Sequence, residues 1–199
     1  MLTFATLGPA GINHEFVTER YLAFYGLEGA NVVLIDDFDD ALRLLADGAA
    51  DFVVQAAVHP AATDTVAKAH FEHGIRVIDT FISPSRPLGV LTRADTAHPK
   101  SLGLQPATKT YLNTARWETL VPEVSIRTVA EGLLAGRFDS GVTALSFMQD
   151  YPGKFRVDEE LGTVDDPWLV YGRARVSDGG VVAWPDSPAA ALFCAALSQ

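Results

Sequence analysis

The stretch TLGPAGINH, residues 6–14, combines backbone amides and polar side chains in a way that suits anion binding. Two glycines, Gly8 and Gly11, lie on either side of a proline, and Asn13 and His14 end the stretch. The apolar run before it predicts a strand, and the amphipathic run after it predicts a helix. A helix start presents unpaired backbone N–H groups, and glycines let the backbone approach an anion closely. The stretch therefore predicts a ligand loop, with an ordinary turn as the alternative.

Four further segments hold the same place between a predicted strand and a predicted helix: residues 55–63, 104–108, 125–128 and 143–146. Each carries hydroxyl, amide or imidazole groups. If all five corners face one cleft, their helix N-termini and neutral donors form a site for a small carboxylate. Such a site does not need basic clusters, which suits a chain with 15 Lys and Arg against 25 Asp and Glu and a net charge of -10.

Two of the five histidines, His14 and His59, lie on these corners and are the candidate catalytic acids, with helix capping as the alternative for each. We expect His70 and His73, on a polar helical stretch, to be solvated. No metal site is expected, because no HExxH, CxxC or paired carboxylate–histidine spacing occurs. The absence of GxSxG and P-loop motifs disfavours α/β-hydrolase and nucleotide-hydrolysing chemistry. The single cysteine, Cys194, cannot form an intrachain disulfide and is expected to be buried.

Composition limits the partners and the location that we expect. With 48% hydrophobic and 20% charged residues among 199, the chain can bury a substantial core. No Lys/Arg cluster is present to neutralise phosphates, so nucleic-acid binding is not expected. The chain has neither a long apolar run nor a leader-like start, so we expect a cytoplasmic protein without membrane contact.

Strands and helices alternate along the chain, which predicts an α/β fold with a largely parallel sheet. One pattern occurs twice, because LLADGAADFVV at residues 44–54 resembles LLAGRFDSGV at residues 133–142. Each predicts a helix, a glycine that ends it, an aspartate and a strand. Unless this repeated pattern is a coincidence, the chain forms two similar lobes with a ligand cleft between them.

We place lobe one at residues 1–83 plus 165–199 and lobe two at residues 84–164. The hinge candidates are the proline-containing segments 83–87 and 165–167. Residues 106–117 are expected to form a helix with a proline at or near its first position.

The order of these segments resembles the prephenate dehydratase family, over roughly residues 2–175. The GPxGT-type loop of that family corresponds to residues 8–11, and its helix–G–x–x–D–strand unit leads through residues 51–55 to His59. A Ser-His-Pro-like corner follows at residues 104–106 and a Ser-Thr-Ala-like helix start at residues 125–127. The resemblance implies a two-lobed, periplasmic-binding-protein-like (type II) α/β fold with a cleft between the lobes. It also implies a small-molecule carboxylate substrate, no cofactor and a homodimer.

The chain departs from that family at the Thr-Arg-Phe motif, which is expected near residues 166–168 and is missing. Residues 167–173 (PWLVYGR) instead look like the prephenate decarboxylase branch of bacilysin-type antibiotic biosynthesis. The stretch TLGPAG and residues 89–95 (GVLTRAD) also resemble that branch.

Three corner residues, Gln55, Val58 and Gln105, differ from what either branch usually carries, so we expect prephenate or a close relative as substrate. Residues 180–198 resemble the first strand and helix of an ACT regulatory domain, cut short. No complete ACT domain and no regulation by phenylalanine are therefore expected. The simpler expectation is a terminal strand and helix packed on lobe one.

Loss of carbon dioxide from the prephenate ring pushes electrons into the diene. These electrons either expel the ring hydroxyl, which is dehydration, or are caught by a proton, which leaves the hydroxyl in place. Pro167 has neither a side-chain donor nor an N–H and so favours the second path. The leading expectation is a cofactor-free carbon–carbon lyase that decarboxylates without aromatisation. The alternatives are a prephenate dehydratase with a drifted motif and a non-catalytic small-carboxylate binding protein.

We expect the first corner to hold one carboxylate of the substrate, and Gln105 with Thr108 to hold the other. Arg86 and Arg127 are candidate charge partners, with surface roles as the alternative. Trp168 forms a wall for the ring or belongs to the core. The predicted site comprises His59 and His14 as catalytic residues and, for binding, Gly8, Pro9, Gly11, Asn13, Gln55, Arg86, Gln105, Thr108, Arg127, Thr128 and Trp168.

Overall fold

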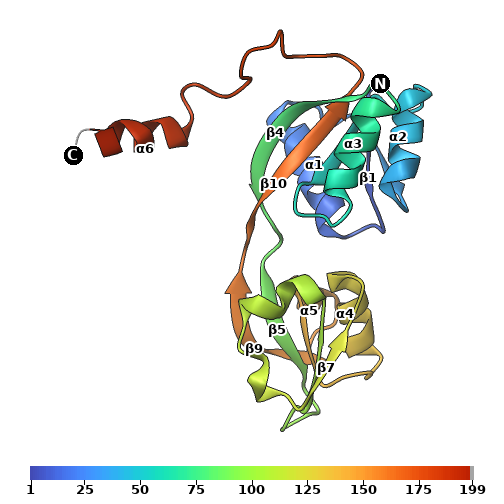
Figure 1. Cartoon of the computed structure of the whole chain (residues 1–199). Helices are drawn as coiled ribbons and strands as arrows, with labels where there is room; N and C mark the ends of the chain where they lie inside the picture. Colours follow the sequence, from blue (N-terminus) through green and yellow to red (C-terminus); the bar gives the residue numbers. More distant parts are fainter. Residues whose placement is uncertain (198–199) are drawn as a thin grey trace.

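A computed structural model describes residues 1–197, and its two five-stranded sheets form two lobes joined by a narrow waist (Figure 1). In chain order the elements are β1 (Thr3–Leu7), α1 (Asn13–Phe24), β2 (Asn31–Ile35), α2 (Phe38–Ala46), β3 (Phe52–Ala56), α3 (Ala62–Phe71), β4 (Arg76–Pro84), β5 (Leu88–Arg93), β6 (Ser101–Leu104), the 3-10 helices η1 (Pro106–Tyr111) and η2 (Thr114–Arg116), β7 (Thr119–Pro122), α4 (Ile126–Leu134), β8 (Ser140–Ala144), α5 (Phe147–Asp150), β9 (Phe155–Gly162), β10 (Asp165–Gly172) and α6 (Pro188–Leu197).

Lobe one is built on the sheet with strand order β2-β1-β3-β10-β4. In this sheet β1 runs parallel to β2 and β3, and β10 runs antiparallel to β3 and β4. Successive residues of a strand point to opposite faces. Ala5 of β1 lies in one core cluster with Leu42 of α2 and Ala69 of α3, and Phe4 lies in another with Val17 of α1. The three helices therefore cover both faces of the sheet.

Lobe two repeats this plan with the strand order β7-β6-β8-β5-β9. Here β6 runs parallel to β7 and β8, and β5 runs antiparallel to β8 and β9. Val129 and Leu133 of α4 pack with Leu91 in one core cluster, whereas the adjacent Val90 packs with Trp117 in the other. Both faces of this sheet are therefore buried as well.

The repeated sequence pattern occupies equivalent places in the two lobes. α2 ends just before Gly48, with a φ of 76°, and α4 ends just before Gly136, with a φ of 73°. Glycine adopts these positive angles without strain, which explains why both helices end there. The carboxylate of Asp51 then accepts the first N–H of β1 at 2.8 Å, and that of Asp139 accepts the N–H just before β6 at 2.8 Å. The two lobes are therefore built from one kind of unit.

Two chain segments cross the waist, residues 85–87 between β4 and β5 and residues 163–164 between β9 and β10. They are tied together, because the N–H of Ser85 donates to the carbonyl of Val164 at 2.8 Å. In return, the N–H of Val164 donates to the hydroxyl of Ser85 at 3.0 Å. The two crossings thus form one double connection between the lobes.

The segment expected to be a helix at residues 106–117 forms η1 and η2 instead. Asn113 divides it, because its side chain accepts the N–H of Ala115 at 3.1 Å and begins a new turn. β9 was not predicted, because it is an edge strand with the charged sequence RVDEE where a buried strand would be apolar.

The C-terminal residues also differ from expectation, since no strand forms between Gly172 and α6 and α6 stands clear of lobe one (Figure 1). Residues 191–196 are exposed, including Cys194, which was expected to be buried. The sequence of α6 is apolar on every side, so the helix has no polar face to fix one orientation against the lobe. Within residues 1–197, none of the helices has the length and apolarity that crossing a membrane requires.

Candidate functional site

The first predicted corner links β1 to α1. Gly11 adopts a φ of 83°, and its N–H donates to the carboxylate of Glu15 one turn into the helix. The N–H of Gly8 donates to the carbonyl of Ile35 at 2.8 Å, and Pro9 is exposed. Both glycine amides thus have partners within the chain. A ligand carboxylate at this corner would have to take the place of Glu15 on Gly11.

An arginine of lobe two reaches this corner across the waist. Arg127, in the first turn of α4, donates through Nη1 to the carbonyl of Ala10 and through Nε to Glu131 at 2.9 Å. The next residue, Thr128, forms a capping box with Ser125, whose hydroxyl accepts the N–H of Thr128 at 3.1 Å. The structure therefore brings these two predicted corners together, with Arg127 between the lobes and Thr128 engaged in the cap.

Arg86 lies in the hinge and faces the start of α1. Its backbone N–H donates to Oδ1 of Asn13 at 3.1 Å, and its guanidinium lies 4.5 Å from the ring centre of Phe16. The Nε of Arg86 is buried and has no hydrogen-bond partner, and within residues 1–197 the guanidinium forms no ion pair. A buried donor without a partner costs about 1–3 kcal/mol, and more if it is charged. This guanidinium is therefore well suited to an anion from outside the chain.

Four rings pack together behind the first corner. His14 lies 5.1 Å from Trp168, 5.8 Å from His59 and 5.9 Å from Phe38, measured between ring centres. Nε2 of His14 accepts the N–H of Ala56 at 3.4 Å. Trp168 is fully buried, and its Nε1 has no hydrogen-bond partner among residues 1–197. Trp168 is thus a core residue rather than an exposed wall of a site.

The surroundings of both histidines favour the neutral imidazole. Burial lowers the pKa of His14 from 6.5 to about 3, helped by the charge of the nearby His59. Burial also lowers the pKa of His59, whose Nδ1 accepts the N–H of Ala61 at 3.2 Å. A lowered pKa disfavours the protonated imidazole, so neither histidine is well suited to donate a proton to a substrate. Among residues 1–197, no three His, Cys, Asp or Glu side chains gather as metal binding would require.

Asp166 is a candidate site residue that the sequence did not single out. It lies at the start of β10, two residues before Trp168, and so on the same face of the strand. Burial raises its pKa, and the charge of Asp165 raises it further. Burial and the charge of Asp166 likewise raise the pKa of Tyr111, in η1 of lobe two. Asp166 is therefore a carboxyl group that holds its proton more strongly than usual and lies where the two lobes meet.

The two predicted binding residues of lobe two, Gln105 and Thr108, differ in whether their side chains are already hydrogen-bonded. Thr108 is buried, and its hydroxyl donates to the carbonyl of Gln105 at 2.9 Å. The side chain of Gln105 is half-buried and makes no hydrogen bond within the described residues. The amide of Gln105 is therefore available to a ligand, whereas the proton of Thr108 is already used.

Gln55, also predicted as a binding residue, makes its hydrogen bonds inside lobe one. It is fully buried, its Nε2 donates to Thr65 at 3.1 Å, and its Oε1 accepts the hydroxyl of Tyr171 at 2.6 Å. The amide is therefore tied between α3 and β10 and is not available to a ligand.

Replacement of Gln55 by leucine is expected to lower the free energy of unfolding by about 1–3 kcal/mol, because Tyr171 loses its buried acceptor. Urea unfolding measures this loss. Gln105→Leu is the matched control and is expected to keep the stability of the original chain, because the side chain of Gln105 makes no hydrogen bond within the described residues. Equal stability of the two variants would show that the contact with Tyr171 does not stabilise the fold.

No protein-family model and no curated protein sequence matches the chain. Solved structures do: prephenate dehydratase from Arthrobacter aurescens, in complex with L-Phe, has a TM-score of 0.67 at 18% identity, over 96% of this chain and 70% of that one. Prephenate dehydratase from Staphylococcus aureus has a TM-score of 0.59 at 14% identity, over 100% and 80%. The periplasmic VFT2 domain of Bordetella pertussis BvgS has a TM-score of 0.50 at 16% identity, over 86% and 80%. At these identities the likeness concerns architecture alone, and the chain has the two-lobed α/β fold that type II periplasmic binding proteins share with prephenate dehydratases.

Proposed function

We propose that the chain binds a small organic carboxylate between its lobes, with Arg86 as the charge partner. The observation that carries this proposal is the buried Nε of Arg86, which has no hydrogen-bond partner in the described part of the chain, although the sequence holds 25 carboxylate side chains. A ligand carboxylate would supply a charge-assisted hydrogen bond, which is roughly twice as strong as a neutral one. Gln105 and Arg127 lie on the facing lobe and complete the proposed grip.

The ligand that we propose is prephenate or a closely related cyclohexadienyl carboxylate, and the reaction is decarboxylation without a cofactor. The bond from the ring to the carboxylate breaks, and its electron pair moves into the diene as carbon dioxide leaves. A ring carbon then takes a proton, so the hydroxyl stays. Asp166 is the proposed proton donor, because burial raises its pKa and it lies beside Pro167 where the two lobes meet. The adjacent Pro167 offers no hydrogen-bond donor to the hydroxyl.

Incubation with prephenate tests this proposal, with ultraviolet absorption and proton magnetic resonance to identify the product. The expected product is non-aromatic and keeps the hydroxyl, and Asp166→Asn is expected to lose turnover while Asp165→Asn keeps it. If the product is phenylpyruvate, the proposed reaction is wrong and the chain is a dehydratase. The absence of both binding and turnover would overturn the proposal.

A non-catalytic binding protein is the second candidate. It is favoured by the state of the predicted catalytic histidines, because His14 is buried and neutral and both imidazoles accept backbone N–H groups. A rise in melting temperature with prephenate, without any turnover, would establish this candidate.

A further inference from the structure

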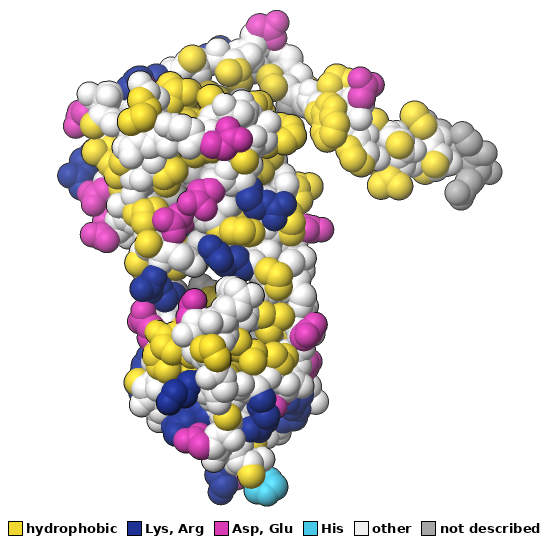
Figure 2. Space-filling model, turned by 180° about the vertical axis from the view of Figure 1, so that it is seen from behind, with side chains coloured by type: hydrophobic (Ala, Val, Ile, Leu, Met, Phe, Trp, Pro, Cys, Tyr) yellow, Lys and Arg dark blue, Asp and Glu magenta, His cyan; other side chains and the backbone are white. Residues whose placement is uncertain are grey.

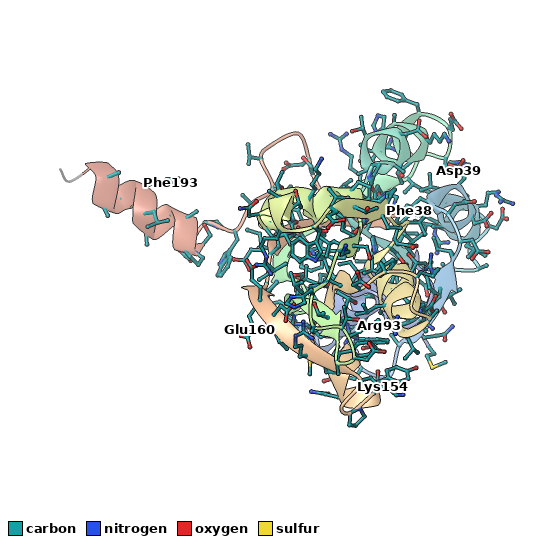
Figure 3. The ribbon with its side chains drawn as sticks, turned by 90° about the horizontal axis from the view of Figure 1, so that it is seen from below. Phe38, Asp39, Arg93, Lys154, Glu160 and Phe193 are labelled. Carbon is teal, nitrogen blue, oxygen red and sulfur yellow. The ribbon has the colours of Figure 1, made fainter. Side chains whose placement is uncertain are left out.

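The C-terminal arm, residues 176–197, presents apolar side chains to solvent. Val181, Trp184, Leu192 and Phe193 are 95%, 67%, 70% and 67% exposed. Figure 2 shows hydrophobic atoms along the arm where it stands clear of lobe one, and Figure 3 shows Phe193 far to the side of both lobes. Hydrogen bonds join residues within the arm itself. For example, the N–H of Ala190 donates to the carbonyl of Ser187 at 2.9 Å.

Such an arm is not stable in water as it stands. A single helix shorter than about 12 residues is marginal by itself, so the ten residues of α6 need tertiary contacts. A helix that is apolar on every side is normally buried. The arm therefore calls for a surface that covers it.

Lobe one carries a matching surface, which we name the α3 groove. It has a volume of about 420 Å³ and is lined by apolar side chains of α3, β4 and β10, among them Val66, Phe71 and Tyr171. Phe71 is 83% exposed. Among the residues that line the groove, Arg76 is the only Lys, Arg, Asp or Glu. It forms no ion pair within residues 1–197.

The charges of the arm are of the opposite sign. Between residues 176 and 197 the charged side chains are Asp178 and Asp186, and α6 itself carries none. The apolar helix α6 follows Asp186, and the apolar α3 groove contains Arg76, so the two surfaces complement each other. The arm and the groove thus agree in both polarity and charge.

We propose that the arm of one copy docks in the α3 groove of a second copy, and that the reciprocal exchange forms a two-fold dimer. The arm leaves the end of β10 and projects away from its own lobe, which presents α6 to another molecule (Figure 1). Exchange of an identical element is a low-cost route to a closed dimer. Each copy offers three exposed rings, Trp184, Phe193 and Phe71, and a buried ring contributes roughly 150–250 Å². Because these rings are 67–83% exposed, those of two copies supply roughly half of the roughly 1,200–2,000 Å² that stable interfaces bury, and the exposed aliphatic side chains of the arm add to it.

Sedimentation velocity tests the dimer with the full chain at about 1–100 μM, a range in which an interface with a micromolar dissociation constant passes from mostly monomer to mostly dimer. We expect a dimer for the full chain and a monomer for two variants, one in the arm (Leu192→Glu with Phe193→Glu) and one in the groove (Val66→Glu with Phe71→Glu). The matched control is Phe24→Glu, which alters an 81% exposed side chain of α1 and should stay dimeric. Circular dichroism checks that each variant is folded.

Mixing the two variants separates exchange between copies from docking within one chain. The arm variant keeps an intact groove and the groove variant keeps an intact arm, so the mixture is expected to form a dimer through one exchange. A full chain that stays monomeric, arm or groove variants that stay dimeric, or a mixture that remains monomeric would each overturn the proposal. The measurement needs no ligand, so its outcome is independent of the carboxylate site.

Discussion

Replacement of Arg86 by alanine is expected to weaken the binding of prephenate by roughly 10- to 150-fold. The estimate follows from the loss of a hydrogen bond to a charged group, worth about 1.5–3 kcal/mol, at about 1.4 kcal/mol for each factor of ten. Stability should change little or increase, because the variant removes a buried Nε that has no hydrogen-bond partner within residues 1–197. Isothermal calorimetry measures the Kd for prephenate. If the chain converts prephenate, the KM from steady-state kinetics is compared in its place.

Two further variants make this result specific to the charge at the hinge. Arg20→Ala is the matched control, because the Arg20 guanidinium also lies over the ring of Phe16, at 5.5 Å, but is exposed. Its affinity for prephenate should remain that of the original chain. Arg86→Lys keeps the charge but not the planar group, so its affinity should fall between the two. If Arg86→Ala bound prephenate as tightly as the original chain, the proposed charge partner would be wrong.

Acidification is expected to destabilise the chain through His14, and replacement of His14 by glutamine should remove that effect. The pKa of this histidine is about 3 in the folded chain and 6.5 ordinarily. Between these values the unfolded chain binds a proton that the folded chain does not, so stability falls as the pH falls. Each pH unit below about 6.5 costs about 1.4 kcal/mol, or about 3 kcal/mol at pH 4.

Urea unfolding at pH 7 and at pH 4 measures the effect. The carboxylates titrate in both proteins, so the difference between the original chain and His14→Gln isolates the histidine. Glutamine can still accept the N–H of Ala56, which preserves stability at pH 7. His98→Gln, at an exposed histidine, should keep the full acid sensitivity. A pH dependence in His14→Gln that equals that of the original chain would show that His14 is not the group responsible.

Local signals in the sequence were enough to predict most elements of the fold. The helix, glycine, aspartate and strand expected twice form α2, Gly48, Asp51 and β3 in lobe one and α4, Gly136, Asp139 and β8 in lobe two. Both depend on apolar periodicity and on a glycine or a cap nearby, which are properties of a few adjacent residues. The two-lobed fold followed from the repeated unit and from the family resemblance.

The candidate site was harder to predict, because its chemistry depends on residues far apart in the chain. Gln55 was expected to bind a ligand, but Tyr171, which follows it by 116 residues, holds its amide in the core. Asp166 was predicted only as part of a hinge, because the burial that raises its pKa depends on tertiary packing and not on its neighbours in the sequence. The stacking of Arg86 on Phe16 likewise has no signature in the sequence.

The double connection at the waist has a mechanical consequence. Two strands tied through Ser85 and Val164 can bend and twist together, but they prevent one lobe from sliding past the other. We therefore expect the lobes to open by a swing about one short axis, which would break the contact of Arg127 with Ala10. The residence time of any molecule held between the lobes is then governed by the frequency of that swing, and stiffening the two strands would lengthen it.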